Sequence, residues 1–301
     1  MRVFLTGATG YIGSVVAEKL QAAGYSVVGL ARSRATAAQL EARGIEPFLG
    51  DLQNPERLEA AAQQVDGVIH TAFIHDFENW SNAVQADCQV IQAFIQALAG
   101  SGKPLITTSD TSVLGDTGST IANEAYPIAQ GFLLAERAKA EQLVLDSAQQ
   151  NIRSAVLRLP LYIYGRGGGT SYIPTRMATA QERQAVQYIE SGEHQVSAVH
   201  VEDVAQLYVL ALERAIAGSV FHAGAESGIT EKAIAQAISQ VVNYPIVSIL
   251  QAEAELVWGS AIAMFFSINN QTSADKAKQQ LGWNPQATLS FLQDIELGSN
   301  F

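Results

Sequence analysis

The stretch Thr6-Gly7-Ala8-Thr9-Gly10-Tyr11-Ile12-Gly13 determines how the rest of the chain is organised. Residues 1–5 before it are apolar and β-prone, and the apolar residues after it recur at helical spacing. A strand therefore enters a glycine-rich turn and leaves as a helix. Gly7 permits a tight turn, Gly10 lets the backbone approach a pyrophosphate, and Gly13 lets the helix pack closely on the strand.

The amides and the positive dipole end of that helix would face the bound anion. A strand, a glycine turn and a helix in this order predict a dinucleotide-binding turn. The alternative is an ordinary strand-to-helix turn that happens to contain three glycines. The residues expected to contact the cofactor here are Gly7, Thr9, Gly10, Tyr11, Ile12 and Gly13.

The composition is that of a globular protein. Of 301 residues, 48% are hydrophobic and 16% charged, which is enough apolar material for a large core. The net charge of −11 argues against partners such as nucleic acid or an anionic membrane. Cys88 is the only cysteine, so no intramolecular disulfide can form, and its apolar setting favours a core position over a nucleophile. Because no signal segment or long apolar run is present, we expect a soluble, cytoplasmic protein.

The end of the second predicted strand, residues 26–31, indicates which dinucleotide is bound. NAD-binding units place an acidic residue near this point for the ribose 2′-hydroxyl, but none occurs between Tyr25 and Gln39. Arg32 and Ser33 offer a guanidinium and a hydroxyl group instead, which suit a 2′-phosphate. NADP(H) is therefore favoured over NAD(H). The alternative is that these side chains are only solvated at a helix start.

Further strands end in polar residues beside the expected cofactor site. Asp51, followed by Leu52, is placed to accept hydrogen bonds from an adenine amine or to cap the helix that begins near Pro55. The continuous apolar run 67–72 predicts a buried parallel strand. Ligands of open α/β sheets bind beyond such strand ends. Thr71, Ala72 and the following Phe73 are therefore expected beside the cofactor.

Strands and helices alternate through about residue 150, which predicts an α/β fold with a doubly wound parallel sheet. Residues 1–160 form the dinucleotide-binding core in this interpretation. Residues 161–301 are mainly a smaller, interleaved C-terminal α/β substrate lobe, from which about 196–222 return to the core. The glycine-rich residues 165–171 are expected to be a flexible loop over the substrate cleft.

The chain resembles the extended short-chain dehydrogenases/reductases, the superfamily that includes nucleotide-sugar epimerases and dehydratases. The resemblance covers nearly the whole chain and rests on segments in the family order: the turn at 6–13, Gly50-Asp51-Leu52, His70-Thr71-Ala72, Leu157-Arg158-Leu159 with Tyr164-Gly165, residues 199–205 and residues 281–285. It implies a Rossmann sheet, a bound nicotinamide dinucleotide and a small-molecule substrate in the C-terminal lobe. By the same resemblance, the helices at 80–99 and 129–150 are candidates for a homodimer interface.

The chain departs from the family at its catalytic motif. The family uses Tyr-x-x-x-Lys, in which the tyrosine transfers a proton and the lysine binds the nicotinamide ribose. Lys139 matches the lysine and is expected both to act in catalysis and to bind the cofactor. The residue four positions earlier is Ala135, and no tyrosine occurs between residues 127 and 150. The chain therefore resembles the atypical members that lack this tyrosine.

The family's third catalytic group is a serine or threonine after the fifth strand, and its place falls on Asp110, between Ser109 and Thr111. Asp110 is a candidate general acid if burial raises its pKa. The alternative is that it caps a turn or helix start. Four tyrosines elsewhere are candidates to replace the missing one in space: Tyr126, Tyr162, Tyr164 and Tyr172.

Three functions are consistent with these residues. The first is NADP(H)-dependent hydride transfer to or from a small carbonyl or hydroxyl compound. The second is a nucleotide-sugar epimerase or dehydratase, although those reactions depend on the missing tyrosine. The third is a non-catalytic dinucleotide-binding redox sensor. His194, His200 and His222 lack metal-ligand spacing, so no metal site is predicted.

Overall fold

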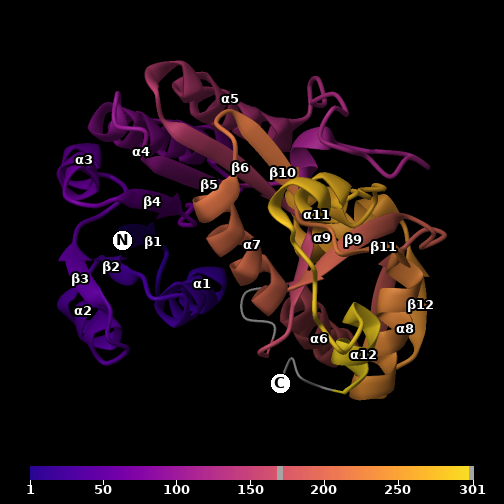
Figure 1. The fold of residues 1–301 in the computed structure, drawn as a ribbon. Helices are drawn as coiled ribbons and strands as arrows, with labels where there is room; N and C mark the ends of the chain where they lie inside the picture. The colour runs from indigo at the N-terminus through magenta and orange to yellow at the C-terminus, as the bar shows by residue number, and fades with distance from the viewer. Residues whose placement is uncertain (168–171, 298–301) are drawn as a thin grey trace.

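Seven parallel strands form the central layer of the protein (Figure 1). The computed structural model describes residues 1–167 and 172–297. The strand order is β10-β6-β5-β4-β1-β2-β3, so the order of connection reverses between β1 and β4, the place where open α/β sheets bind ligands. The predicted doubly wound α/β fold is confirmed. The strands are β1 (Arg2–Thr6), β2 (Ser26–Ala31), β3 (Glu46–Leu49), β4 (Gly67–His70), β5 (Pro104–Asp110), β6 (Arg153–Leu159) and β10 (Ser219–His222).

Helices cover both faces of this sheet. Successive side chains of β1 point to opposite faces, so Val3 and Leu5 pack with α1, α2 and α7, whereas Phe4 packs with α3, α4 and α5. Figure 1 shows these two helical layers on either side of the strands. The helices are α1 (Tyr11–Ala22), α2 (Arg34–Glu41), α3 (Pro55–Gln63), α4 (Trp80–Leu98), α5 (Ala138–Asp146) and α7 (Val201–Arg214). Among residues 1–167 and 172–297, no helix has the length and apolar character needed to cross a membrane.

The helix predicted at 129–150 begins later than expected. Gly131 has a φ of +69°, in the left-handed region that a right-handed helix excludes. The chain therefore becomes helical only from Leu133, as the 3₁₀ segment η2 (Leu133–Arg137). It continues as α5 and closes as η3 (Ser147–Gln150), and another short 3₁₀ segment, η1 (Thr111–Leu114), follows β5.

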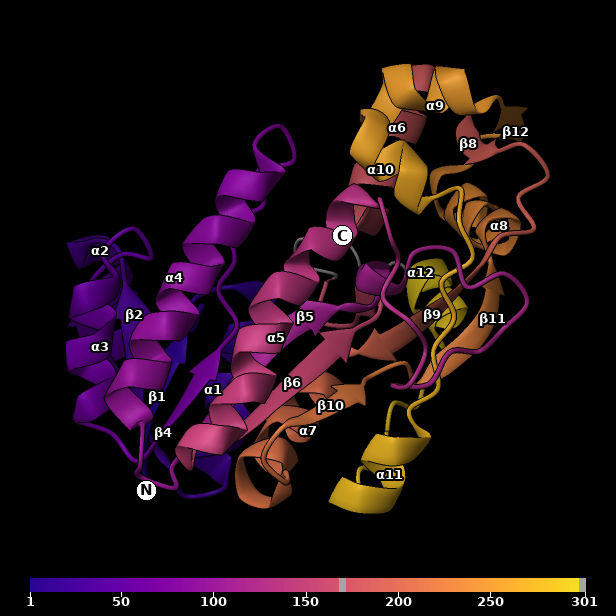
Figure 2. The same ribbon diagram turned by 90° about the horizontal axis from the view of Figure 1, so that it is seen from above.

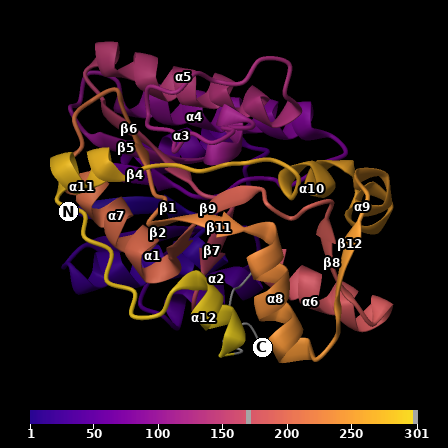
Figure 3. The ribbon, with the colours of Figure 1, turned by 90° about the vertical axis from the view of Figure 1, so that its right-hand side faces the viewer.

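A smaller lobe lies beyond the carboxyl ends of the core strands (Figure 2). It contains a three-stranded sheet, a two-stranded sheet and several helices, and α8 and α12 pack side by side in it (Figure 3). The segment expected to return to the core divides: β9 belongs to the lobe, α7 packs on α1, and β10 forms one edge of the central sheet. The lobe elements are β7 (Tyr162–Tyr164), α6 (Tyr172–Arg183), β8 (Val186–Ile189), β9 (Gln195–His200), β11 (Glu226–Thr230), α8 (Glu231–Val242), β12 (Ile246–Ile249), α9 (Gln251–Trp258), α10 (Ser260–Phe265) and α12 (Phe291–Glu296), whereas α11 (Asp275–Leu281) packs on α7.

Two residues after β7 fasten the lobe to the core. The Tyr11 hydroxyl, in the first turn of α1, donates a hydrogen bond to the Gly165 carbonyl oxygen at 2.5 Å. Arg166 forms ion pairs with Glu18 of α1, at 2.6 Å, and with Glu202 of α7. The beginning of the predicted flexible loop is therefore held against two core helices, and its residues 168–171 lie outside the described residues.

Candidate active site

The glycine turn forms a close-fitting cradle between β1 and α1. Gly7 has a φ of +74°, which favours glycine, and a Cβ atom on Gly13 would overlap the Gly7 carbonyl oxygen. Gly10 stands immediately before α1, where it has no side chain to cover the amides of the first helical turn. Such uncovered amides at a helix N-terminus bind phosphate groups. The residues present therefore fit the pyrophosphate of a dinucleotide.

Buried hydrogen bonds hold this cradle to the next strand. The Thr6 hydroxyl accepts from the Ala72 amide at 3.2 Å and also shares a hydrogen bond with His70 Nδ1, 2.6 Å away. The other ring nitrogen of His70, Nε2, lies 2.9 Å from the Asp87 carboxylate. Thr71 completes the network by donating to the Thr6 carbonyl at 2.7 Å. The ends of β1 and β4, which flank the reversal point of the sheet, are thus locked together.

A cavity of about 410 Å³ opens beside this turn. The ends of β5 and β6 form its floor, and α6 and α10 of the lobe contribute to its walls. Aromatic rings follow one another from the core to the lobe, with centroid separations of 5.3 Å for Phe73–Trp80, 5.5 Å for Trp80–Phe77, 6.4 Å for Phe77–Phe265 and 6.1 Å for Phe265–Tyr172. We call these five residues the aromatic wall.

Arg137 supplies a buried cation at the edge of the cavity. Its guanidinium donates to Asp110 Oδ2 at 2.7 Å and to the Thr108 carbonyl at 3.0 Å, and it lies 4.1 Å from the centroid of the Phe73 ring. Burial, followed by the Arg137 charge, lowers the pKa of His75, which also lines the cavity. The positive charge of Arg137 is therefore already paired inside the protein.

Lys139 does not reach the cavity. Its side chain is 67% exposed and pairs with Glu136 at 3.0 Å on the outer side of the helix. Residues two apart point to opposite sides of a helix, so Arg137 faces inward where Lys139 faces outward. Counting four residues back from Arg137 gives Leu133, so no tyrosine precedes the cation in either register. The structure therefore places Arg137, and not the predicted Lys139, at the edge of the cavity. Ala135 is buried but is not one of the residues that line the cavity.

The three residues predicted at the end of β5 divide between two roles. Asp110 caps η1 by accepting from the Ser112 amide at 3.0 Å, as the capping alternative expected, and it also pairs with Arg137. Thr111 points away from the cavity and donates to Asn270 Oδ1. Ser109 lines the cavity, is buried, and has no hydrogen-bond partner for its hydroxyl among the described residues.

Of the four candidate tyrosines, only Tyr172 lines the cavity among the residues that the structure describes. Tyr162 is fully buried and donates to Glu231 at 2.9 Å. Tyr164 donates to the Leu289 carbonyl and to Glu226, and Tyr126 packs in a separate small cluster. The sequence alone could not place any of the four tyrosines at the cofactor, because their positions depend on how the chain folds in three dimensions.

The adenine side of the predicted cofactor site lies at the ends of β2 and β3. Arg32 is exposed and, within the described part of the chain, forms no ion pair, whereas the Ser33 hydroxyl caps α2 by accepting from the Thr36 amide at 3.1 Å. Asp51 accepts from the Gln53 amide at 2.9 Å, and Leu52 is half-buried against the α3–α4 side of the core. Arg32 thus keeps its guanidinium available for a ligand.

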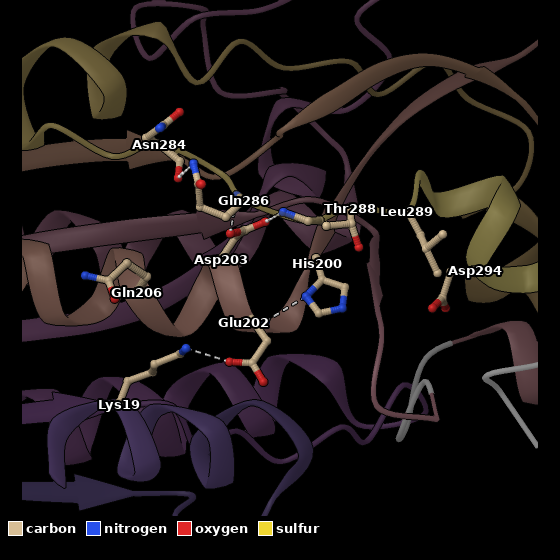
Figure 4. A pocket seen from close by; sticks show the side chains of 11 residues that line it. Lys19, His200, Glu202, Asp203, Gln206, Asn284, Gln286, Thr288, Leu289 and Asp294 are labelled. Carbon is tan, nitrogen blue, oxygen red and sulfur yellow. Dashed lines mark hydrogen bonds and ion pairs between the residues drawn. The ribbon is translucent and has the colours of Figure 1, made fainter. Parts of the chain in front are cut away.

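A second cavity, of about 290 Å³, lies between α1, α7 and residues 284–294 (Figure 4). Lys19 reaches into it and pairs with Glu202 at 2.7 Å. Asp203, at the start of α7, accepts from the Gln286 amide at 2.7 Å. These charges join α1 and the C-terminal segment to α7. None of the described residues that line this cavity belongs to the glycine turn or the aromatic wall.

The cradle, the strand order and the lobe over the strand ends are those of the extended short-chain dehydrogenases/reductases. Residues 3–224 match the NAD dependent epimerase/dehydratase family, and the chain belongs to that family. Uncharacterized protein C2A9.02 of Schizosaccharomyces pombe is 40% identical over 285 residues, 95% of each chain. A 4-hydroxy-2-methyl-3-oxo-4-farnesyl-3,4-dihydroquinoline-1-oxide ketoreductase of Stigmatella aurantiaca is 29% identical, over 73% of this chain and 67% of its own.

Among solved structures, the dTDP-glucose 4,6-dehydratase DesIV of Streptomyces venezuelae, with NAD bound, has a TM-score of 0.81 to this protein. The match covers 99% of this chain and 96% of that chain at 18% sequence identity. At that identity the likeness is one of fold. The expected resemblance to the extended superfamily is confirmed.

Proposed function

We propose that the protein is an NADP(H)-dependent reductase of a small, apolar carbonyl compound. The observation that carries this proposal is the aromatic wall, which lies directly beside the glycine cradle at the reversal point of the sheet. A mostly apolar pocket with a few polar groups at one end suits an uncharged organic substrate.

The chain's own residues suit three parts of the cofactor. The amides after Gly10 would hold the pyrophosphate, Arg32 would pair with the 2′-phosphate, and the strand ends at Thr71 and Ser109 would border the nicotinamide. When bound, the cofactor supplies a hydride ion to the carbonyl carbon. The preference for NADP(H) rests on the unpaired Arg32 and on the absence of an acidic residue between Tyr25 and Gln39.

The lining of the cavity disfavours a nucleotide sugar. A sugar nucleotide carries a diphosphate that requires cationic partners, and Arg137, the one cation among the described lining residues, is paired with Asp110. Two relatives are named as reductases of a ketone, and neither is named for a nucleotide sugar. The ketoreductase described above is named for a substrate with a farnesyl group, and a Shewanella oneidensis relative that is 29% identical over 69% of this chain is a 2-alkyl-3-oxoalkanoate reductase.

The test is a cofactor titration followed by a substrate screen. NADPH and NADH binding would be measured by fluorescence, and aromatic ketones, alkyl ketones, aldehydes and nucleotide sugars would then be screened by NADPH absorbance. We expect NADPH oxidation with apolar carbonyl compounds and none with nucleotide sugars. Tight NADPH binding without turnover across the panel would instead support a non-catalytic redox sensor.

The cofactor preference has a separate test in Arg32→Ala. Because the guanidinium is assigned to the 2′-phosphate alone, the variant should bind NADPH at least tenfold more weakly and NADH within twofold of the unaltered protein. Arg183→Ala, at the exposed end of α6, is the matched control and should leave both affinities unchanged. Equal losses for NADPH and NADH in Arg32→Ala would contradict the NADP(H) assignment.

A further inference from the structure

The cavity contains several hydroxyl groups, but most already serve the fold. Tyr11 donates to the Gly165 carbonyl, and Thr71 donates to the Thr6 carbonyl. Thr108 donates to the His70 carbonyl, 2.8 Å away, and also contacts the Tyr208 hydroxyl. Each of these groups would have to give up a hydrogen bond to act on a substrate.

Asp110 and Ser112, which also line the cavity, are likewise engaged in hydrogen bonds within the protein. Ser112 donates its hydroxyl to Asp110, and Asp110 also accepts from Arg137 and from the Ser112 amide. Its carboxylate oxygens are therefore already engaged by three donors, one of them a guanidinium. His75 has its pKa lowered by burial and by Arg137, so its imidazole is neutral near pH 7.

Two hydroxyl groups remain. Among the described residues that line the cavity, Ser109 and Tyr172 are those whose hydroxyls form no hydrogen bond with the protein. Ser109 comes from the end of β5 in the core, and Tyr172 opens α6 in the lobe, beside Phe265 of the aromatic wall. Both residues line the same cavity, so their hydroxyls are the groups left to hydrogen-bond the oxygen of a carbonyl compound bound there. A phenol is a far stronger acid than an alkyl alcohol, so the two are not equivalent as proton donors.

We propose that Tyr172 is the catalytic proton donor of this protein and that Ser109 hydrogen-bonds the same substrate oxygen. The step balances: a hydride adds to the carbonyl carbon, the C=O π electrons move to oxygen, and the Tyr172 O–H bond breaks as its proton joins that oxygen. Water returns the proton to the phenolate when the alcohol leaves. The tyrosine missing from the α5 region is thus replaced from the lobe, and the inference rests on the proposed reductase function.

The surroundings of Tyr172 keep it in the form that can donate. Burial raises the pKa of Tyr172, and the nearby Asp110 carboxylate adds to the effect. The hydroxyl therefore stays protonated throughout the physiological pH range. The alkoxide formed on reduction is a stronger base than the phenolate, so the proton transfer remains downhill.

Tyr172→Phe tests the assignment because it keeps the ring in the aromatic wall and removes only the hydroxyl. With the most active ketone of the screen, kcat should fall at least 100-fold, while the Kd for NADPH and the Tm stay unchanged. A second readout needs no turnover: binding of acetophenone to the NADP⁺-loaded protein, measured by calorimetry, should weaken about three- to tenfold for the lost hydrogen bond. Tyr126→Phe, outside the cavity, should change neither value.

The outcomes separate this inference from the function on which it rests. If the unaltered protein reduces no carbonyl compound, the proposed function fails and this inference with it. If the unaltered protein turns over and Tyr172→Phe keeps its kcat within threefold, the proposed function stands and Tyr172 is not the donor. A 100-fold loss in Ser109→Ala with no loss in Tyr172→Phe would likewise overturn the assignment.

Discussion

Replacing Arg137 by methionine tests whether the positive charge of this residue, rather than that of Lys139, stabilises the fold beside the cavity. Methionine keeps an unbranched apolar side chain, but it removes the ion pair to Asp110, the hydrogen bond to the Thr108 carbonyl and the guanidinium over the Phe73 ring. Hydrogen bonds to charged groups contribute about 1.5–3 kcal/mol each, and a desolvated cation–π contact about 1–2 kcal/mol.

The net loss is smaller than these contributions together, because water can reach the partner that is left behind. The Asp110 side chain is 26% exposed and keeps its two donors from Ser112, whereas Arg137 itself is 7% exposed. We therefore expect Arg137→Met to lower the free energy of unfolding by about 3 kcal/mol. For a chain of this length that corresponds to a fall in Tm of roughly 5 °C.

The assay is urea unfolding followed by tryptophan fluorescence, with Lys139→Met as the matched control. Lys139 is 67% exposed and, within the described residues, pairs only with Glu136 three residues away, so its replacement should change stability by less than about 0.5 kcal/mol. Turnover should follow the same order, because Arg137 fixes the end of β5 where Ser109 lies. Equal losses of stability in the two variants, or a tenfold loss of turnover in Lys139→Met alone, would refute this reasoning.

Three further perturbations follow from the cradle and the core. Gly13→Ala places a Cβ against the Gly7 carbonyl oxygen, so NADPH affinity should fall more than tenfold in a fluorescence titration; unchanged affinity would contradict the cradle assignment. Thr6→Val removes the acceptor of the Ala72 amide and should cost about 1–3 kcal/mol in urea unfolding, whereas a neutral result would show that water replaces the hydroxyl. Burial, with the Arg158 charge, lowers the pKa of His222 to about 3. Near pH 6.5 the His222 side chain therefore binds a proton in the unfolded chain but not in the folded chain. Stability should therefore decrease by about 1.4 kcal/mol per pH unit as the pH falls below 6.5, and His222→Asn should flatten that slope in unfolding curves measured from pH 7 to pH 5.

The parts of the fold set by neighbouring residues could be predicted from the sequence. The bounds of β2, Ser26–Ala31, match the prediction because an apolar run between a glycine and a polar turn depends on few distant contacts. The glycine cradle was predicted for the same reason: the positive φ of Gly7 and the close packing of Gly13 are requirements of the local backbone.

Whether Arg137 or Lys139 faces the cavity depends on which side of the η2–α5 helical segment is buried. Leu134, Arg137, Glu141 and Val144 follow the spacing of a buried helical face, and all four are buried. This spacing was available in the sequence and would have favoured Arg137 over Lys139. The family motif led to Lys139 instead, since a lysine is expected in that motif.

The role of Tyr172 could not be predicted from sequence alone. Tyr172 contacts Phe265 only after the lobe has folded, and it shares a cavity with the end of β5 only after the lobe has packed on the core. Those partners lie about 60 to 90 residues away along the chain. Contacts of such sequence separation leave no periodic signal in either segment.

The fastening of the lobe at Tyr11 and Arg166 has a consequence for protein engineering. The lobe does not rest on the core as an independent module, because its first residues after β7 are bonded to α1 and α7. A chimera that grafts this lobe onto another dinucleotide-binding core will need a tyrosine at the place of Tyr11 and carboxylates at those of Glu18 and Glu202. A recombination boundary drawn at residue 160 alone would separate the lobe from these three anchors.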